Sequence, residues 1–180
     1  MNGTRYICLD TETTGLSASN DRVCEIAALE FDPETFEIVE SFHTYLNPCR
    51  DVPYYATRVH GLTAGFLRDK PVFAEITDDF LDFVGDSHLL IHNSSFDTRM
   101  LNSELSRVGV PTLDMQCRSI TCTLRMANAL RGRGRNKLDD LCRDFGIDAS
   151  MRTLHGALVD TQLLVRVVHR LVMMGARLPD

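Results

Sequence analysis

The chain has 180 residues, of which 44% are hydrophobic and 24% are charged, and its formal net charge is −6. This length predicts one domain over residues 1–180 with a sizeable core, and the sequence has no uncharged apolar run of the roughly 18 residues that a membrane span needs. The negative charge excludes a protein that binds nucleic acid only by neutralising phosphates, although bound divalent cations would reverse its sign locally.

The start of the chain and its cysteines both indicate a cytoplasmic protein. Residues 1–5 lead directly into a strand, without the apolar run and cleavage site of a secretory signal peptide. The six cysteines include no Cys-x-x-Cys pair, and Cys8, Cys24 and Cys142 lie within apolar patterns. Because free cysteine behaves there as a small hydrophobic residue, we predict reduced thiols rather than disulfides.

The opening strand lies within residues 4–16 and carries two acids, Asp10 and Glu12. Side chains two residues apart leave a strand on the same face, so these carboxylates reach one small volume. Neighbouring carboxylates disfavour each other's ionised form, and a shared proton or a bound cation relieves the repulsion. Taken alone, the pair is more often two solvated acids in a turn than a catalytic site.

Two further strands, over residues 23–31 and 36–45, are predicted to form an antiparallel meander with the first. Short helical pieces between residues 53 and 67 follow, with Thr63 as a helix N-cap. A longer helix after Pro71 is predicted because its apolar residues recur at helical spacing. These residues are Phe73, Ile76, Phe80, Phe83 and Val84.

A short apolar strand over residues 88–92 is predicted next. It leads into a helix that Ser94 or Ser95 caps and that continues to about Leu105. Asp97 would lie in the first turn of this helix, where the helix dipole favours an acid even without a function.

The segment after Pro111 is predicted to hold an edge strand near residues 115–118 and a helix over about residues 119–130. An Arg/Gly loop at 131–135 follows, and then a short helix that ends before Gly146. Between residues 117 and 143 there are seven Lys or Arg and only two Asp. The loop is therefore a candidate contact for a nucleic-acid backbone, although a solvated flexible loop fits the sequence nearly as well.

The last helix is predicted over about residues 156–174 and is stopped by Gly175. His155 and Asp160 are five residues apart, which on one continuous helix would separate them by about 140°. If His155 instead lies on the loop before the helix, with Asp160 in the first turns, the imidazole can swing over the carboxylate. That arrangement suits a mobile base beside a fixed metal ligand.

Four acids and one histidine thus come at strand ends and helix starts, in the order Asp-x-Glu, Asp, His-x4-Asp. They are Asp10, Glu12, Asp97, His155 and Asp160. Each has an ordinary structural explanation when taken singly, but four carboxylates without a thiolate together select Mg²⁺ or Mn²⁺ over zinc. Two such ions about 3.5 to 4 Å apart can hold both the attacking water and the leaving oxygen of a phosphoryl displacement.

These motifs resemble the DEDDh, or DnaQ-like, 3′–5′ exonucleases over nearly the whole chain. The matching segments are residues 9–15 (LDTETTG), 59–62 (VHGL), 69–75 (DKPVFAE), 91–97 (IHNSSFD), 135–139 (RNKLD) and 152–157 (RTLHGA). Within the family the sequence looks most like the proofreading epsilon subunits of bacterial DNA polymerase III. A related class has Tyr four residues before the final Asp, but Gly156 stands there, so the histidine class is indicated.

The resemblance implies an α/β, ribonuclease H-like fold: a mixed five-stranded sheet, antiparallel meander plus parallel strands, flanked by helices. It implies that Asp10 bridges two ions, that Glu12 and Asp160 complete one site and Asp97 supports the other, and that His155 is the general base. The resemblance places the terminal nucleotide among Thr11, Thr13, Thr14, Leu16, Ala56, His60, His92, Asn93 and Phe96. Core packing explains Leu16 and Phe96 about equally well, and His60 and His92 are also typical of structural histidines.

We therefore predict a metal-dependent exonuclease that releases nucleoside 5′-monophosphates from single-stranded DNA 3′ ends, in proofreading or repair, with a replicative polymerase subunit as partner. One alternative is a stand-alone exoribonuclease that resembles ribonuclease T or oligoribonuclease and acts on RNA. The other is a non-catalytic adaptor, against which the presence of all five site residues argues. Epsilon subunits continue into a flexible tail that holds the polymerase, whereas this sequence ends at Asp180, so we expect that a tail was removed or that the protein works alone.

Overall fold

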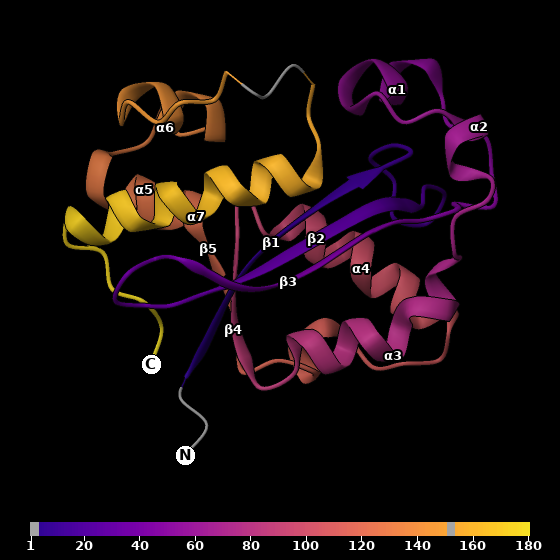
Figure 1. Ribbon diagram of the computed structural model, residues 1–180, viewed down its shortest axis with the longest axis horizontal. Coiled ribbons are helices and arrows are strands. Elements are labelled where there is room, and N and C mark those ends of the chain that lie inside the picture. The colour runs from indigo at the N-terminus through magenta and orange to yellow at the C-terminus, as the bar shows by residue number, and fades with distance from the viewer. Residues whose placement is uncertain (1–3, 151–153) are drawn as a thin grey trace.

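The computed structural model describes residues 4–150 and 154–180, and a mixed five-stranded sheet lies at its centre (Figure 1). The strand order is β3-β2-β1-β4-β5. The first three strands pair antiparallel, and β4 and β5 continue the sheet parallel to β1, which confirms the predicted sheet. The strands are β1 (Arg5–Thr13), β2 (Val23–Phe31), β3 (Ile38–Tyr45), β4 (Ser87–Ile91) and β5 (Ser119–Cys122).

Helices cover both faces of the sheet (Figure 1). On one side lie α3 (Phe73–Val84) and α4 (Ser95–Arg107), and on the other α5 (Thr123–Arg131), α6 (Leu138–Asp144) and α7 (Ala157–Met173). The remaining short elements are α1 (Tyr54–His60), α2 (Ala64–Leu67) and the 3₁₀ helix η1 (Leu113–Met115). None of the described helices is long and apolar enough to cross a membrane.

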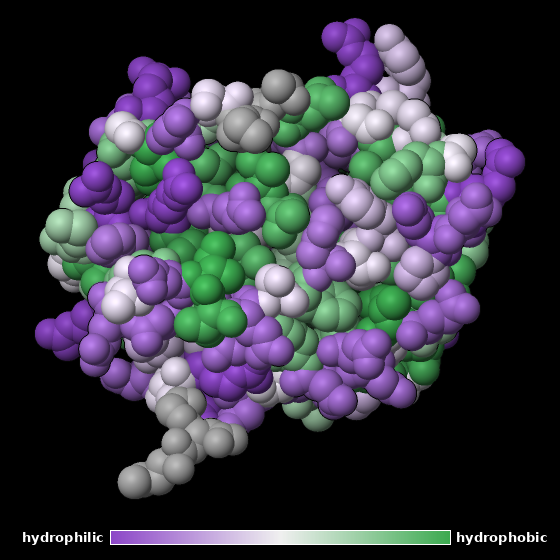
Figure 2. All heavy atoms as spheres, viewed as in Figure 1, coloured by the Kyte–Doolittle hydropathy of each residue, from purple (hydrophilic) through white to green (hydrophobic). Residues whose placement is uncertain are grey.

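Alternating side chains of β1 separate the two halves of the core. Ile7 and Leu9 pack with residues of α3 and α4, whereas Cys8 packs with residues of α7. Because successive side chains of a strand point to opposite faces, Asp10 and Glu12 leave β1 on the same side as Cys8, toward α7. Figure 2 shows hydrophobic side chains gathered over the α6–α7 half of the visible face.

The sequence predicted most elements to within two residues, with one exception between β4 and α5. The edge strand expected near residues 115–118 is wrong, because that segment includes the end of η1, and the strand comes later, as β5. The helix expected from residue 119 therefore starts only at Thr123. The backbone of residues 119–122 pairs with β4, a tertiary contact that a local apolar pattern does not reveal.

Smaller differences also have physical reasons. The third strand starts at Ile38 rather than Phe36, because Phe36 has a φ of 58° and stacks its ring on His169 of α7. Thr63 caps α2 as predicted, since its Oγ1 accepts the Phe66 N–H at 3.2 Å. Ser94 stands at the start of α4, but its side chain makes no capping hydrogen bond. The cysteines are free thiols, as predicted.

Candidate active site

A cleft with a volume of about 360 Å³ opens at the carboxyl ends of β1 and β4. Ligands of open α/β sheets bind outside the carboxyl ends of parallel strands, so the sheet topology itself favours this place. All five predicted catalytic residues line the cleft. Its lining is Asp10, Thr11, Glu12, His92, Asn93, Phe96, Asp97, Leu138, His155 and Asp160.

The acids in the cleft repel one another strongly. The pKa of Asp10 lies well above its ordinary value because the carboxyl is buried and because Asp97, Glu12 and Asp160 carry the same charge nearby. Burial also raises the pKa of Asp97 to about 7, although hydrogen bonds from the Thr11 side chain and backbone act in the opposite direction. Without a cation, the site therefore holds protons at neutral pH.

Asp97 is tied to β1 by two hydrogen bonds. It lies in the first turn of α4 and is 3% exposed. Its Oδ1 accepts the Thr11 N–H at 3.1 Å and the Thr11 Oγ1–H at 2.8 Å. Thr11 thus joins the carboxylate of α4 to the strand that carries Asp10 and Glu12, and this contact keeps the acids close despite their repulsion.

His155 lies on the loop directly before α7, and Asp160 lies in the first turn of that helix, as the sequence predicted. The His155 side chain is 49% exposed, and its Nδ1 is 3.3 Å from Oδ2 of the buried Asp160. The backbone N–H of His155 donates to the Val59 carbonyl of α1 at 3.0 Å. Arg152 and Thr153 of the matching motif lie outside the described residues.

The donor set fits a divalent cation. Glu12, His155 and Asp160 each place one possible ligand atom within 4.8 Å of the other two. Carboxylate oxygens dominate the cleft, and hard cations prefer oxygen ligands. A bound cation would also neutralise the repulsion that raises the pKa of Asp10. The cleft therefore offers a donor set that suits a divalent metal ion.

The raised pKa of Asp97 predicts how pH changes the stability of the metal-free protein. An acid whose pKa is higher in the folded than in the unfolded state stabilises the fold at low pH, and this contribution is lost as pH rises through the folded pKa of about 7. We expect the melting temperature in EDTA to fall from about pH 5 to about pH 8 by several degrees more in the wild type than in Asp97→Asn. Differential scanning calorimetry of both proteins checks this, and equal slopes would contradict the buried, protonated Asp97.

The predicted nucleotide-binding residues fall into two groups. Thr11, His92, Asn93 and Phe96 line the cleft, and Phe96 also packs against the core. Contact of these four residues with a nucleotide stays a prediction. The other five are not among the described residues that line the cleft: Thr13, Thr14, Leu16, Ala56 and His60.

These other five residues lie around the contact between α1 and the end of β1. The Tyr55 hydroxyl on α1 donates to the Thr14 carbonyl at 3.4 Å. Leu16 is 77% exposed, so the alternative that it is a core residue is wrong. Its exposed position leaves the side chain accessible to a nucleotide, as the resemblance implies, and its contact with a nucleotide stays a prediction.

The two predicted nucleotide-binding histidines, His60 and His92, are held in the neutral form by burial. Burial lowers the pKa of His92 to about 4, and its Nδ1 is 2.9 Å from the Thr123 Oγ1. Burial also lowers the pKa of His60, whose Nδ1 accepts the Leu62 N–H at 3.0 Å. At neutral pH, these rings are therefore neutral hydrogen-bonding groups rather than cations that attract phosphate.

Sequence reasoning missed Leu138 and Glu25. Leu138 starts α6 and lines the cleft. It belongs to the matching segment at residues 135–139, but it was not predicted as a site residue. Glu25 is 2% exposed and stands opposite Glu12 on β2. An acid in the buried apolar middle of a strand was the available signal, since a buried charge needs specific partners.

The Arg/Gly loop is anchored to the helices on both sides of it. Asn136 is buried, and its Nδ2 donates to the Asn128 Oδ1 and to the Gly132 carbonyl, both at 2.8 Å. Arg131 pairs with Asp144 of α6. The loop therefore leads directly to Leu138 at the cleft, and its contact with a nucleic-acid backbone stays a prediction.

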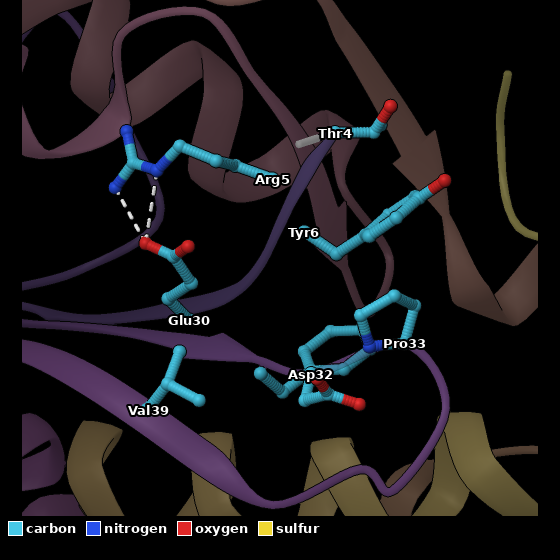
Figure 3. Close-up of a pocket in the computed structure, with 8 residues that line it drawn as sticks. Thr4, Arg5, Tyr6, Glu30, Asp32, Pro33 and Val39 are labelled. Atoms are coloured by element: carbon cyan, nitrogen blue, oxygen red, sulfur yellow. Dashed lines mark hydrogen bonds and ion pairs between the residues drawn. The ribbon is translucent and has the colours of Figure 1, made fainter. Parts of the chain in front are cut away.

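A larger cavity of about 640 Å³ lies elsewhere, where the start of β1 meets the β2–β3 hairpin (Figure 3). Its central feature is an ion pair, in which the Arg5 Nη2 lies 2.6 Å from the Glu30 Oε2. Around the pair stand ordinary surface residues, including Thr4, Pro33 and Val39. Because Arg5 pairs with Glu30, and the Asp32 carboxylate accepts backbone N–H groups of its own turn, this cavity lacks the repelling acids that mark the cleft at β1 and β4.

Comparison with known proteins agrees with the chemistry of the cleft. The family model RNase_T, described as exonuclease, matches residues 7–168. The protein named DNA polymerase III subunit epsilon in Rickettsia conorii is 44% identical over 181 residues, which cover 98% of this chain and 76% of that protein. The protein of the same name in Salmonella typhimurium is 42% identical over 171 residues, which cover 91% of this chain and 70% of that protein.

Solved structures share the fold at lower identity. Exonuclease X in complex with 5′ overhanging duplex DNA superposes with a TM-score of 0.72 at 21% identity, over 96% of this chain and 94% of that chain. The zinc-bound complex of E. coli exonuclease I with single-stranded DNA has a TM-score of 0.81 at 22% identity, over 96% of this chain and 41% of that chain.

Proposed function

The chain belongs to the RNase_T exonuclease family, and from this membership we propose that it proofreads replicated DNA by removing nucleoside 5′-monophosphates one at a time from 3′ ends. The observation that carries the proposal is the meeting of five residues in one cleft: Asp10, Glu12, Asp97, His155 and Asp160. The relatives named as polymerase III epsilon subunits support DNA as the substrate and proofreading as the role.

The four carboxylates are proposed to hold two divalent ions, Mg²⁺ or Mn²⁺. When bound, such ions stabilise the charge on a phosphodiester in displacement and lower the pKa of a water molecule. Asp10 would contribute to both ions, because burial and the charges of Asp97, Glu12 and Asp160 all raise its pKa, which puts this carboxyl among the other three acids. Glu12 and Asp160 would complete one ion site, and Asp97, held by Thr11, would support the other.

His155 is the proposed general base. Its imidazole is half exposed on a loop, so it can approach a substrate without moving the sheet. Asp160 Oδ2, 3.3 Å from Nδ1, orients the ring, favours the tautomer with Nε2 as the proton acceptor, and stabilises the imidazolium that forms. The proton leaves the attacking water for this nitrogen while the carboxylates hold the rest of the site in place.

The five residues around the contact between α1 and the end of β1 are proposed to hold the terminal nucleotide. Thr13, Thr14 and Leu16 follow directly after the two acids of β1, and Ala56 and His60 belong to α1. The Thr13 backbone is within hydrogen-bonding reach of the His60 ring. The exposed Leu16 supplies an apolar surface for a base, and the neutral His92 and Asn93 supply hydrogen-bonding groups in the cleft.

Matched oligonucleotides test the proposal. Single-stranded DNA and RNA of one sequence, labelled at the 5′ end, are incubated with the protein and Mg²⁺, and the products are resolved on a denaturing gel. We expect DNA to shorten stepwise from its 3′ end with release of 5′-monophosphates, and RNA to be degraded more slowly. Faster degradation of RNA would favour the exoribonuclease, and no degradation of either would favour the adaptor.

A replicative polymerase subunit is the proposed protein partner, because relatives of the chain are named as subunits of such a polymerase. A cytoplasmic location and a single exonuclease domain over residues 1–180 are parts of the same proposal. Co-purification of the protein with a replicative polymerase would test the partnership separately from the nuclease assay.

A further inference from the structure

Glu25 is a buried acid that lies behind the cleft. It stands in the middle of β2, is 2% exposed, and pairs in register with Glu12 of β1. Its Oε2 accepts the backbone N–H of Ala157 at 3.1 Å, and its Oε1 is 2.9 Å from the His43 Nε2 of β3. Both carboxylate oxygens are thus held, one by a helix and one by a side chain of the neighbouring strand.

The Ala157 contact lies, along the chain, between His155 and Asp160, the two site residues at the start of α7. Ala157 is the first residue of α7, two residues after His155 and three before Asp160. Gly156, the N-cap position, has no side chain to satisfy the free N–H groups of the first turn. Glu25 supplies the missing acceptor from the sheet, and a negative charge is favourable at the positive end of the helix dipole.

A carboxylate at this place also has a cost. The charge of Glu25 adds to burial and to the charges of Asp97, Glu12 and Asp160 in raising the pKa of Asp10. Docking of α7 on the sheet does not depend on this acid alone, because the buried Leu164, Val165 and Val168 of α7 pack in one cluster with residues of β1 and β2. Glu25 is therefore positioned to cap the first turn of α7 rather than to hold the helix on the sheet.

We propose that Glu25 is a positioning residue. Its carboxylate, which also contacts His43, caps α7 from β2 and thereby fixes the positions of His155 and Asp160 relative to Asp10 and Glu12. The proposal rests on the proposed function of the same site. The backbone N–H of His155 also donates to the Val59 carbonyl. Loss of the Glu25 cap would therefore free the first turn of α7, while the backbone of His155 stays bound to α1.

Two substitutions separate the acceptor from the charge. Glu25→Ala removes the cap, whereas Glu25→Gln keeps a carbonyl oxygen for the Ala157 N–H and an amide that can donate to His43. The matched control is Glu30→Ala, on the same strand, which breaks the partly buried ion pair with Arg5 in the distant cavity (Figure 3). All proteins are compared at one temperature well below their melting points.

The first measurement is kcat and KM on a nitrophenyl ester of a nucleoside 5′-monophosphate, which reports on the catalytic centre without a long strand. We expect Glu25→Ala to lower kcat about 10- to 100-fold with little change in KM, and Glu25→Gln to keep most of the activity. Glu30→Ala should lower the melting temperature and keep kcat. If Glu25→Ala lowers only the melting temperature, or Glu25→Gln is as inactive as Glu25→Ala, the cap does not position the site.

The second measurement is a Mn²⁺ titration followed by the melting temperature, which needs no turnover. Because Asp160 would lose its fixed position, Glu25→Ala should raise the Mn²⁺ midpoint about tenfold, and Glu25→Gln and Glu30→Ala should not. An unchanged midpoint in Glu25→Ala would overturn the proposal. If the wild type hydrolyses neither ester nor DNA, the proposed function fails, and this titration still decides the role of Glu25.

Discussion

The Asp10→Asn protein should lose about 10³-fold or more in kcat on single-stranded DNA, and its metal-free form should melt at a higher temperature than the wild type. Asp10 is proposed to contribute to both ions, so its replacement would take away metal assistance worth about 4 kcal/mol, which corresponds to the loss in rate. Asn keeps the size of Asp but carries no charge. Its neutral amide therefore avoids both the burial of a charge and the repulsion of that charge by Asp97, Glu12 and Asp160, which together raise the pKa of Asp10.

Opposite effects on activity and stability distinguish a metal ligand from a structural acid. Nucleotide release with Mg²⁺ and melting curves in EDTA measure the two effects on the same protein. Asp32→Asn is the control, since the Asp32 carboxylate accepts backbone N–H groups of Glu34 and Thr35 in the β2–β3 turn, away from the cleft. This variant should keep its activity and lose some stability. A less stable metal-free Asp10→Asn protein would contradict the electrostatic account of the site.

Replacement of His155 by Gln should lower kcat by about 10²- to 10⁴-fold and leave KM and the Mn²⁺ midpoint close to those of the wild type. The imidazole is half exposed, whereas three of the four carboxylates that would hold the ions are buried, and all four remain intact in the variant. Proton transfer is then lost while metal and substrate still bind.

The division of the rate loss between kcat and KM provides the sharper measurement for His155. Loss of a general base lowers kcat alone, because metal and substrate still bind. His169→Ala is the matched control on α7, because that ring stacks on Phe36 with centroids 4.4 Å apart, outside the cleft. A rate loss in His155→Gln that arises entirely from KM would make His155 a binding residue instead.

The agreement between the sequence and the structure is best where the signal is local. Asp10 and Glu12 share a face because side chains alternate along any strand, and Asp97 lies in the first turn of α4 because the helix starts directly after β4. The helical spacing of apolar residues likewise predicted α3 and α7 to within about one residue. Such patterns depend only on backbone geometry and burial, so they can be read without the fold.

Other features depended on contacts between distant segments. β5 forms because residues 119–122 pair with β4, and its own residues gave no strand signal strong enough to displace the predicted helix. The role of Leu138 in the cleft follows from where α6 packs. The partners of Glu25 lie 18 and 132 residues away along the chain, so no local pattern could show that this acid meets the start of α7.

By itself, the sequence determined the order of the strands and helices, the four acids and the histidine, and the family that their spacing resembles. Only the tertiary structure decided that His155 reaches Asp160, that Thr11 holds Asp97 beside β1, and that Glu25 caps α7. The physical reason is that hydrogen bonds and charge repulsion act over a few ångströms in space, whatever the separation of their residues along the chain.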